Sequence, residues 1–161
     1  MKEMIISITE FFDKTWYSDY EKKHVVFDGF EILTNRQKII LAIGNEQQCC
    51  EDVGYFMTND NLEDFLDSSL ESIDYVDGNL KVHEVAITIS NQLDNFNHTY
   101  SKYFIDNKRE IELNAKDNYA LFVNFHTSKG KLQFVAYNAG NGYYGHAFEL
   151  ISEQVTHSTS I

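Results

Sequence analysis

The sequence predicts a single α+β domain that is dominated by an antiparallel β-sheet and carries one or two short helices. Alternating apolar and polar residues mark about eight to ten short strand segments, and only brief stretches show apolar residues at helical spacing. Turn sequences that contain glycine or asparagine separate several of these segments. The chain has 161 residues, which is one domain's worth, and no linker-like change of composition divides it. We therefore expect one domain over residues 1–161.

The N-terminal segment is expected to form a short helix followed by a strand. Ser7 and Glu10 have the spacing of a capping box, and apolar residues follow Ser7 at helical intervals. The next stretch, residues 14–20, is rich in aromatic side chains and predicts a strand.

A meander of antiparallel strands is expected next. The dipeptide Asp28–Gly29 favours a hairpin turn between two short apolar segments, residues 24–27 and 30–33. Asn35–Arg36 predicts a second turn. Residues 38–43, with the apolar run 39–43, predict a buried central strand that ends before a glycine.

The middle of the chain combines strand segments with one acidic helix. Residues 49–58 predict a strand. Residues 61–70 predict a short helix, because their apolar members share one face and their acidic members lie off it. Further strands are expected at 72–76, 80–90, 100–105 and 109–113, with a turn at 77–79 and a polar loop at 91–98.

The C-terminal part shows the clearest alternation. Every second residue of the segment 119–126 is apolar, so these side chains share one face of a strand. A turn is expected at 127–130, and residues 131–137 predict the returning strand. A last strand is expected within 142–151. Residues 152–161 are polar and lack periodicity, so we expect them to be a frayed tail.

The charge of the chain is strongly negative and unevenly distributed. There are 25 acidic and 13 basic residues, which give a net charge of −12. Because such a charge repels phosphates, it argues against direct binding to nucleic acid or to an anionic membrane. Residues 1–80 hold 17 acids and 6 bases, a net of −11, and positions 39–80 contain no Lys or Arg. The acids of this stretch are Glu46, Glu51, Asp52, Asp60, Glu63, Asp64, Asp67, Glu71, Asp74 and Asp77.

This acidic stretch has two interpretations. It is either a solvated face that keeps the protein soluble, or an electrostatic ligand for a basic surface. A field of one sign steers association with a basic cleft. In the second case the helix at 61–70 would display its carboxylates somewhat as a DNA backbone displays phosphates.

The cysteines do not have the spacing of a metal site. Only Cys49 and Cys50 occur, so no disulfide framework is expected, and a reducing cytoplasm is the expected compartment. Adjacent cysteines on a strand point to opposite faces, whereas zinc sites use C-x₂₋₄-C spacing. No two of the six histidines lie three or four residues apart. We therefore expect no metal and no cofactor.

The G-x-G-x-x-G sequence at 140–145 is interpreted as a turn or bulge. A dinucleotide-binding fingerprint requires a helix after the glycines, and a strand is expected here. Two alternatives to a binding protein remain. One is a host-takeover accessory protein without a nuclease partner. The other is a small metal- or cysteine-dependent phage enzyme built around Cys49, Cys50, His126 and His146.

The chain resembles an uncharacterised small domain family of phages and bacteria in two patches, QQCCEDVGYF at 47–56 and NGYYGHAFEL at 141–150. That family has a Cys-Cys-Glu motif after a central strand and an aromatic strand near its end. The chain is also similar to anti-CRISPR proteins, which are small acidic inhibitors of the type II CRISPR effector nuclease. This second resemblance implies a partner with a basic nucleic-acid channel or a nuclease domain that the protein would block.

Together these observations predict a phage-encoded, non-enzymatic inhibitor that acts in the cytoplasm of a bacterial host cell. Its expected partner is a type II CRISPR effector nuclease or another basic nucleic-acid enzyme. Carboxylates of the acidic face would make the contact, with exposed aromatic side chains as anchors. The predicted contact residues are Glu51, Asp52, Tyr55, Asp60, Glu63, Asp64, Asp67, Glu71 and Tyr143.

Overall fold

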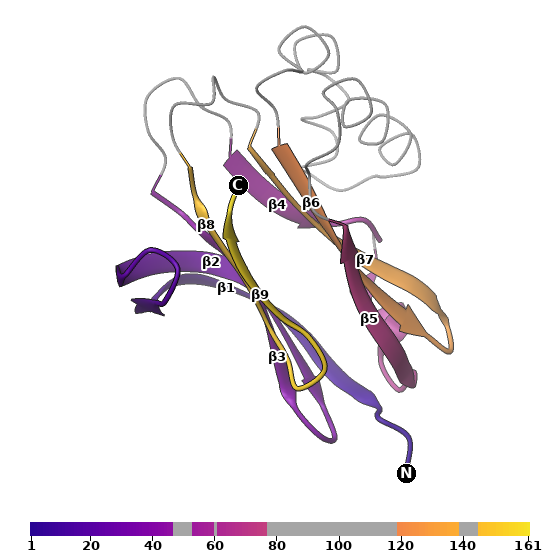
Figure 1. Cartoon of the computed structure of the whole chain (residues 1–161). Coiled ribbons are helices and arrows are strands. Elements are labelled where there is room, and N and C mark those ends of the chain that lie inside the picture. The colour runs from indigo at the N-terminus through magenta and orange to yellow at the C-terminus, as the bar shows by residue number, and fades with distance from the viewer. Residues whose placement is uncertain (47–52, 60, 77–118, 139–144) are drawn as a thin grey trace, which may run out of the picture.

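The structure is a computed structural model that describes residues 1–46, 53–59, 61–76, 119–138 and 145–161. These residues form two antiparallel sheets that pack face to face (Figure 1). In spatial order, the first sheet contains β1 (Ile5–Ser18), β2 (Lys23–Thr34), β3 (Lys38–Gly44), β8 (Ala147–Ile151) and β9 (Thr156–Ser160). The second contains β4 (Val53–Met57), β7 (Gly130–Asn138), β6 (Tyr119–Thr127) and β5 (Leu70–Val76). The antiparallel, sheet-dominated part of the predicted fold class is therefore confirmed.

A continuous apolar core fills the space between the two sheets. Every second residue of the central strands points into it, as the alternation at 119–126 and 131–137 predicts. The ring of Phe30 on β2 contacts Tyr55 on β4 and Phe134 on β7, with centroid distances of 5.7 and 6.1 Å. Each large side chain buried in this way contributes about 1.5–3 kcal/mol. Side chains that are fully buried in the core include Ile32, Ile39, Leu41, Phe148, Met57, Leu121, Phe125 and Phe134.

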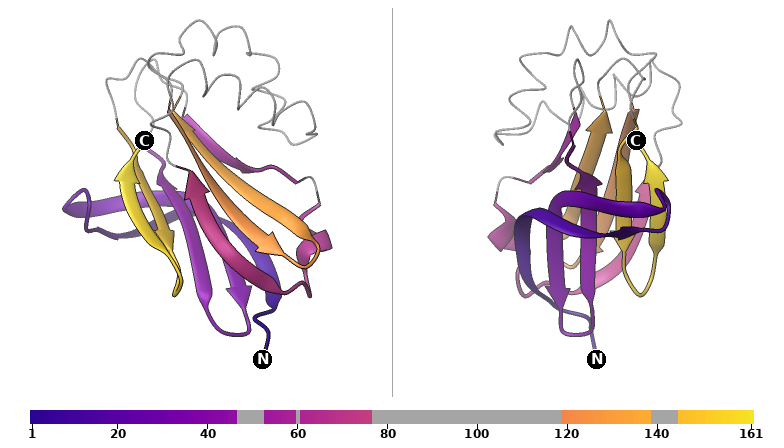
Figure 2. Two further views of the ribbon diagram at one scale, coloured as in Figure 1. Left: turned by 45° about the vertical axis from the view of Figure 1, so that its right-hand side comes forward. Right: turned by 90° about the vertical axis from the view of Figure 1, so that its left-hand side faces the viewer.

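The far end of the β1–β2 hairpin bends across the outer face of the first sheet (Figure 2, right). The strand register shifts between Phe11 and Lys14, where Asp13 adopts a positive φ of 54°. The bend places the Trp16 indole over Phe27, stacked at a centroid distance of 4.0 Å. A second, smaller apolar cluster forms beneath this bent end, which we call the arm (residues 12–27).

Two predictions for the N-terminal region are wrong. The capping-box spacing at Ser7 and Glu10 does not begin a helix, because this segment pairs with β2 along its length and is part of β1. Asp28–Gly29 does not form a hairpin turn either. Strand β2 runs through it, and the chain reverses at 19–22 instead.

The acidic helix expected at 61–70 is present only as one 3₁₀ turn, η1 (Leu62–Phe65). The chain becomes extended at Leu66, and Asp67 has a positive φ of 60°. Backbone bonds to Ile5 then hold residues 67 and 68, which excludes further helical turns. The described residues contain no α-helix, so they do not support the α+β class. None of their helices is long and apolar enough to cross a membrane.

The C-terminal residues are not a frayed tail. Residues 156–160 form β9, which pairs along its length with β8, and the Ile161 side chain is only 5% exposed within the core. Two backbone hydrogen bonds of 2.9 and 2.8 Å join Ile161 to His146. The prediction of a frayed tail is wrong because β9 is polar and is stabilised by backbone pairing with β8. Such pairing leaves no apolar pattern in the sequence.

The remaining strand predictions fall into two groups. Strands at 38–43, 72–76, 119–126 and 131–137 are confirmed, as are the turns at 35–36 and 127–130. The expected strands within 49–58 and 142–151 are confirmed over 53–57 and 147–151. The elements expected between 77 and 118 lie outside the described residues, together with the glycines at 140 and 142.

Candidate interaction surface

Four exposed carboxylates lie on η1 and the residues that follow it. Glu63 and Asp64 are in the 3₁₀ turn, Asp67 is in the link to β5, and Glu71 is at the start of β5. We call these four residues the acidic ridge. They are the members of the predicted contact set that the structure describes and finds exposed.

The side chains of the 3₁₀ turn hold the ridge against the sandwich. Phe65 is buried in the main core, and Leu62 and Leu66 pack partly against it. Asn61 caps the turn, because its Oδ1 accepts a hydrogen bond from the Glu63 backbone N–H at 3.2 Å. Its Nδ2 donates to Asp64 Oδ1 at 3.0 Å, which orients that carboxylate.

Backbone hydrogen bonds fix the other half of the ridge to the start of β1. The Asp67 N–H donates to the Ile5 carbonyl, and the Ile5 N–H donates to the Ser68 carbonyl, both at 2.9 Å. The Leu70 N–H donates to the Glu3 carbonyl at 2.7 Å. Hydrogen bonds therefore order the backbone of the ridge, and among its carboxylates they also orient Asp64.

No ion pair to a ridge carboxylate forms within the described residues. Lys129 lies beside the ridge, where its Nζ donates to the Leu66 carbonyl at 2.7 Å rather than to a carboxylate. A lysine–carboxylate ion pair does form elsewhere, between Lys38 and Glu31 at 3.5 Å. Lys129 offsets part of the ridge's negative charge, and the four carboxylates can still form ion pairs with a basic partner.

Not all of the predicted contact residues lie at this surface. The Tyr55 ring is only 4% exposed and stacks against Phe134 at 5.9 Å, so it is a core residue and the prediction of an exposed anchor is wrong. Tyr55 is buried because it takes an inward position on β4. Four other predicted residues, Glu51, Asp52, Asp60 and Tyr143, lie outside the described residues.

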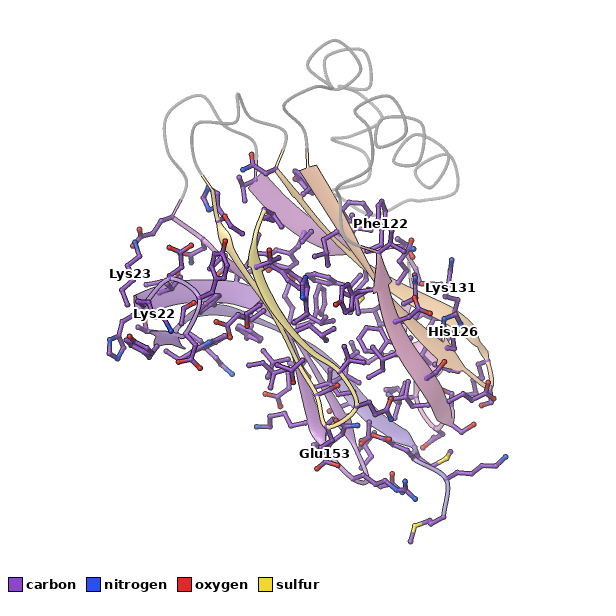
Figure 3. The ribbon with its side chains drawn as sticks, in the orientation of Figure 1. Lys22, Lys23, Phe122, His126, Lys131 and Glu153 are labelled. Carbon is purple, nitrogen blue, oxygen red and sulfur yellow. The ribbon has the colours of Figure 1, made fainter. Side chains whose placement is uncertain are left out.

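The most exposed aromatic side chains of the described residues lie on the arm, whereas Tyr75 on β5 is 38% exposed and stacks against the ring of His157. Phe12, Tyr17 and Tyr20 are 57%, 49% and 51% exposed. Figure 3 shows Lys22 and Lys23 at the same end of the molecule. The one sequence feature that points to these exposed aromatic side chains is the aromatic-rich stretch 14–20. It does not reveal that the end of the hairpin extends beyond the main core.

The histidines of the alternative enzyme are not brought together. His126 is on β6 of the second sheet, whereas His146 precedes β8 of the first sheet and its Nδ1 lies 3.1 Å from the Gly44 carbonyl oxygen. The cysteines at 49 and 50 lie outside the described residues. Within the described ranges no three His, Cys, Asp or Glu side chains are grouped to hold a metal ion.

His126 instead forms a surface pair with Asp74 of β5. Its Nε2 lies 2.5 Å from Asp74 Oδ2, and Asn124 Nδ2 donates to Asp74 Oδ1 at 2.8 Å (Figure 3 labels His126). The hydrogen bond from Asn124, followed by the hydrogen bond and charge of His126, lowers the pKa of Asp74 despite its partial burial. The pair links an edge strand to its neighbour.

A family model described as a domain of unknown function, DUF7448, matches residues 20–150. The chain belongs to the DUF7448 family. The DUF7448 match includes the acidic ridge and the strands from β2 to Leu150 of β8, whereas β1 and β9, the two edge strands of the first sheet, lie outside it. A search of curated proteins and a search of solved structures each found no match.

Proposed function

We propose that this DUF7448 protein is a non-enzymatic, phage-encoded inhibitor that acts in the bacterial cytoplasm by binding a basic nucleic-acid enzyme. A type II CRISPR effector nuclease is the first candidate partner. The observation that carries the proposal is the acidic ridge, with four exposed carboxylates, no ion pair within the described residues, and fixed backbone positions. An electrostatic ligand of this kind competes with nucleic acid for a cationic surface.

The hydrogen-bonded backbone of the ridge supports binding rather than simple solvation. A solvated face needs only charge, whereas a recognition surface gains affinity when its groups are ordered before binding. Here Asn61 orients Asp64, and Ile5 holds Asp67. The net charge of −12 supports a cationic partner in the same way and opposes direct binding to nucleic acid.

The experiment is a DNA-cleavage assay with a purified, guide-loaded type II effector nuclease. Adding the protein before the target DNA should abolish cleavage at a stoichiometric ratio, and adding it after the DNA should inhibit less if the two compete for one channel. Cleavage that is unaffected at a large excess of protein would refute this choice of partner.

A further inference from the structure

A cleft of about 240 Å³ opens between the end of β3 and the start of β4. Its walls are Ile43, Gly44 and Asn45 on one side, and Val53, Gly54 and Tyr55 on the other, with Asp28 of β2 beside them. This volume is below the roughly 300–1,000 Å³ of sites for drug-sized ligands, and it is large enough for one long side chain.

The cleft has a carboxylate held in a fixed position. Asp28 is partly buried, and its Oδ1 accepts two hydrogen bonds of 2.9 Å, from Asn45 Nδ2 and from the Asp13 backbone N–H. The other oxygen, Oδ2, makes no hydrogen bond to the described residues. Two hydrogen bonds thus orient the Asp28 carboxylate, and its Oδ2 can accept from a donor outside the described residues.

The charge at this end of the cleft is not balanced within the described residues. Asn45 Nδ2 also donates to Asp13 Oδ1 at 2.8 Å, so one neutral amide bridges two carboxylates. No Lys, Arg or His of the described residues forms an ion pair with either one. The two like charges repel each other, and a cation bound beside Asp28 would relieve that repulsion.

Apolar and charged groups thus adjoin in one small cleft. The lining residues Ile43, Val53 and Tyr55 can cover an alkyl stem, and Asp28 can accept from the cationic group at its end. Arginine has this division into a long stem and a charged head. Its guanidinium is less hydrated than an ammonium and matches a carboxylate with several donors, so it is favoured over lysine in a partly buried site.

We infer that this cleft binds the side chain of an arginine presented by a basic protein partner. The inference rests on the proposed function only for the source of the arginine. The cleft and the acidic ridge involve different residues, so each can be tested without the other.

The test is a titration of the ¹⁵N-labelled full chain, followed by NMR, with N-acetyl-arginine-N-methylamide as the probe. The matching citrulline compound has nearly the same shape and no charge. We expect the arginine probe to bind in the millimolar range and to shift the amide signals of Asp28, Asn45, Val53 and Gly54. The citrulline probe and an Asp28→Asn variant should each weaken binding by roughly tenfold or more, because a charged hydrogen bond is lost.

Two further variants separate the shape of the cleft from the charge of the protein. Val53→Phe fills the cleft and should abolish probe binding without removing any charge, which matters if Asp28→Asn is poorly folded. Asp19→Asn removes a carboxylate on the arm and should leave the affinity unchanged. Equal binding of both probes, or unchanged binding in Val53→Phe, would overturn the inference.

The source of the arginine is tested by comparing the capped probe with free L-arginine. A side chain in a protein has no free α-ammonium or α-carboxylate, so the capped probe should bind at least as tightly. Tighter binding of free arginine would contradict the assignment to a protein partner. Because no nuclease is present, failure here leaves the cleavage assay of the proposed function unaffected.

Discussion

At Gly29 the backbone of β2 lies so close to β3 that no side chain fits. A Cβ added there would be 1.8 Å from the Leu41 carbonyl oxygen, which belongs to the backbone and cannot move aside. The glycine is therefore required by the bend of the arm rather than by a turn. Asp28–Gly29 has the composition of a hairpin turn, and nothing in the dipeptide distinguishes a tight turn from a close approach between strands.

We predict that Gly29→Ala lowers the free energy of unfolding by more than about 3 kcal/mol, because one of the two strands must shift. Gly44→Ala is the control. Its added Cβ would meet the Val25 side chain at 3.2 Å, and we expect a change below about 1 kcal/mol. Urea unfolding of both variants measures the difference. Similar stabilities for the two would show that the approach at Gly29 is not tight.

The Asp74 pair predicts a pH dependence. The pKa of Asp74 is lowered from its usual 3.8, so the ionised form stabilises the folded state above that value. This contribution is lost as the pH falls from about 5 through the lowered pKa. Urea unfolding of wild type and Asp74→Asn at neutral and acidic pH measures it.

Because Asp74 and His126 are both largely exposed, the effect should be less than about 1 kcal/mol. We expect Asp74→Asn to be less stable than wild type near neutral pH and to lose less stability on acidification. Asp19→Asn, on the arm, should follow the wild-type profile. An Asp74→Asn profile parallel to that of wild type would show that the pair does not contribute.

At the scale of elements, the alternation of apolar and polar residues predicts the central strands and does not predict β9. Strands such as β6 and β7 are flanked on both sides and contribute alternate side chains to the core, so burial leaves a pattern in their sequence. β9 is an edge strand with five polar or partly polar residues, and its position depends on pairing with β8. The Ser7–Glu10 segment shows the converse, since pairing with β2 overrides a local helix signal.

We predict that the C-terminal residues are needed for stability. Ile161→Ala should lower the free energy of unfolding by about 2–4 kcal/mol, because a buried side chain is removed from the core. Ile151→Ala is the matched control. Its side chain is partly exposed on β8, so we expect a loss below about 1 kcal/mol. Unfolding curves that coincide for Ile161→Ala and wild type would restore the interpretation of a frayed tail.

At the scale of the whole molecule, the two sheets carry the acidic ridge and the cleft at Asp28 on different residues. The net acidity and the stretch without Lys or Arg were evident in the sequence, and they indicated the acidic ridge correctly as an exposed group of carboxylates. The exposed aromatic anchors were not predictable, because alternation cannot say which face of β4 lies inward until its sheet partner is known. Tyr55 is therefore a core residue, and the most exposed aromatic rings of the described residues are on the arm.

We predict that neutralising the acidic ridge affects binding and leaves folding nearly unchanged. Glu63→Gln combined with Asp64→Asn should change the free energy of unfolding by less than about 0.5 kcal/mol, since exposed charges contribute little. Both substitutions keep the size of the side chain, and Asn at position 64 can still accept from Asn61. Asp19→Asn combined with Glu153→Gln removes the same number of charges from exposed positions elsewhere.

The most direct test of the account is the affinity of these two double variants and of wild type for the purified type II effector nuclease, measured by calorimetry at low and moderate salt. We expect the ridge variant to bind at least roughly tenfold more weakly than wild type, the control variant to bind within about threefold of it, and wild-type affinity to fall as salt screens the contact. Equal affinities for the ridge variant and the control, without a response to salt, would contradict the account and leave the ridge as a solvated face.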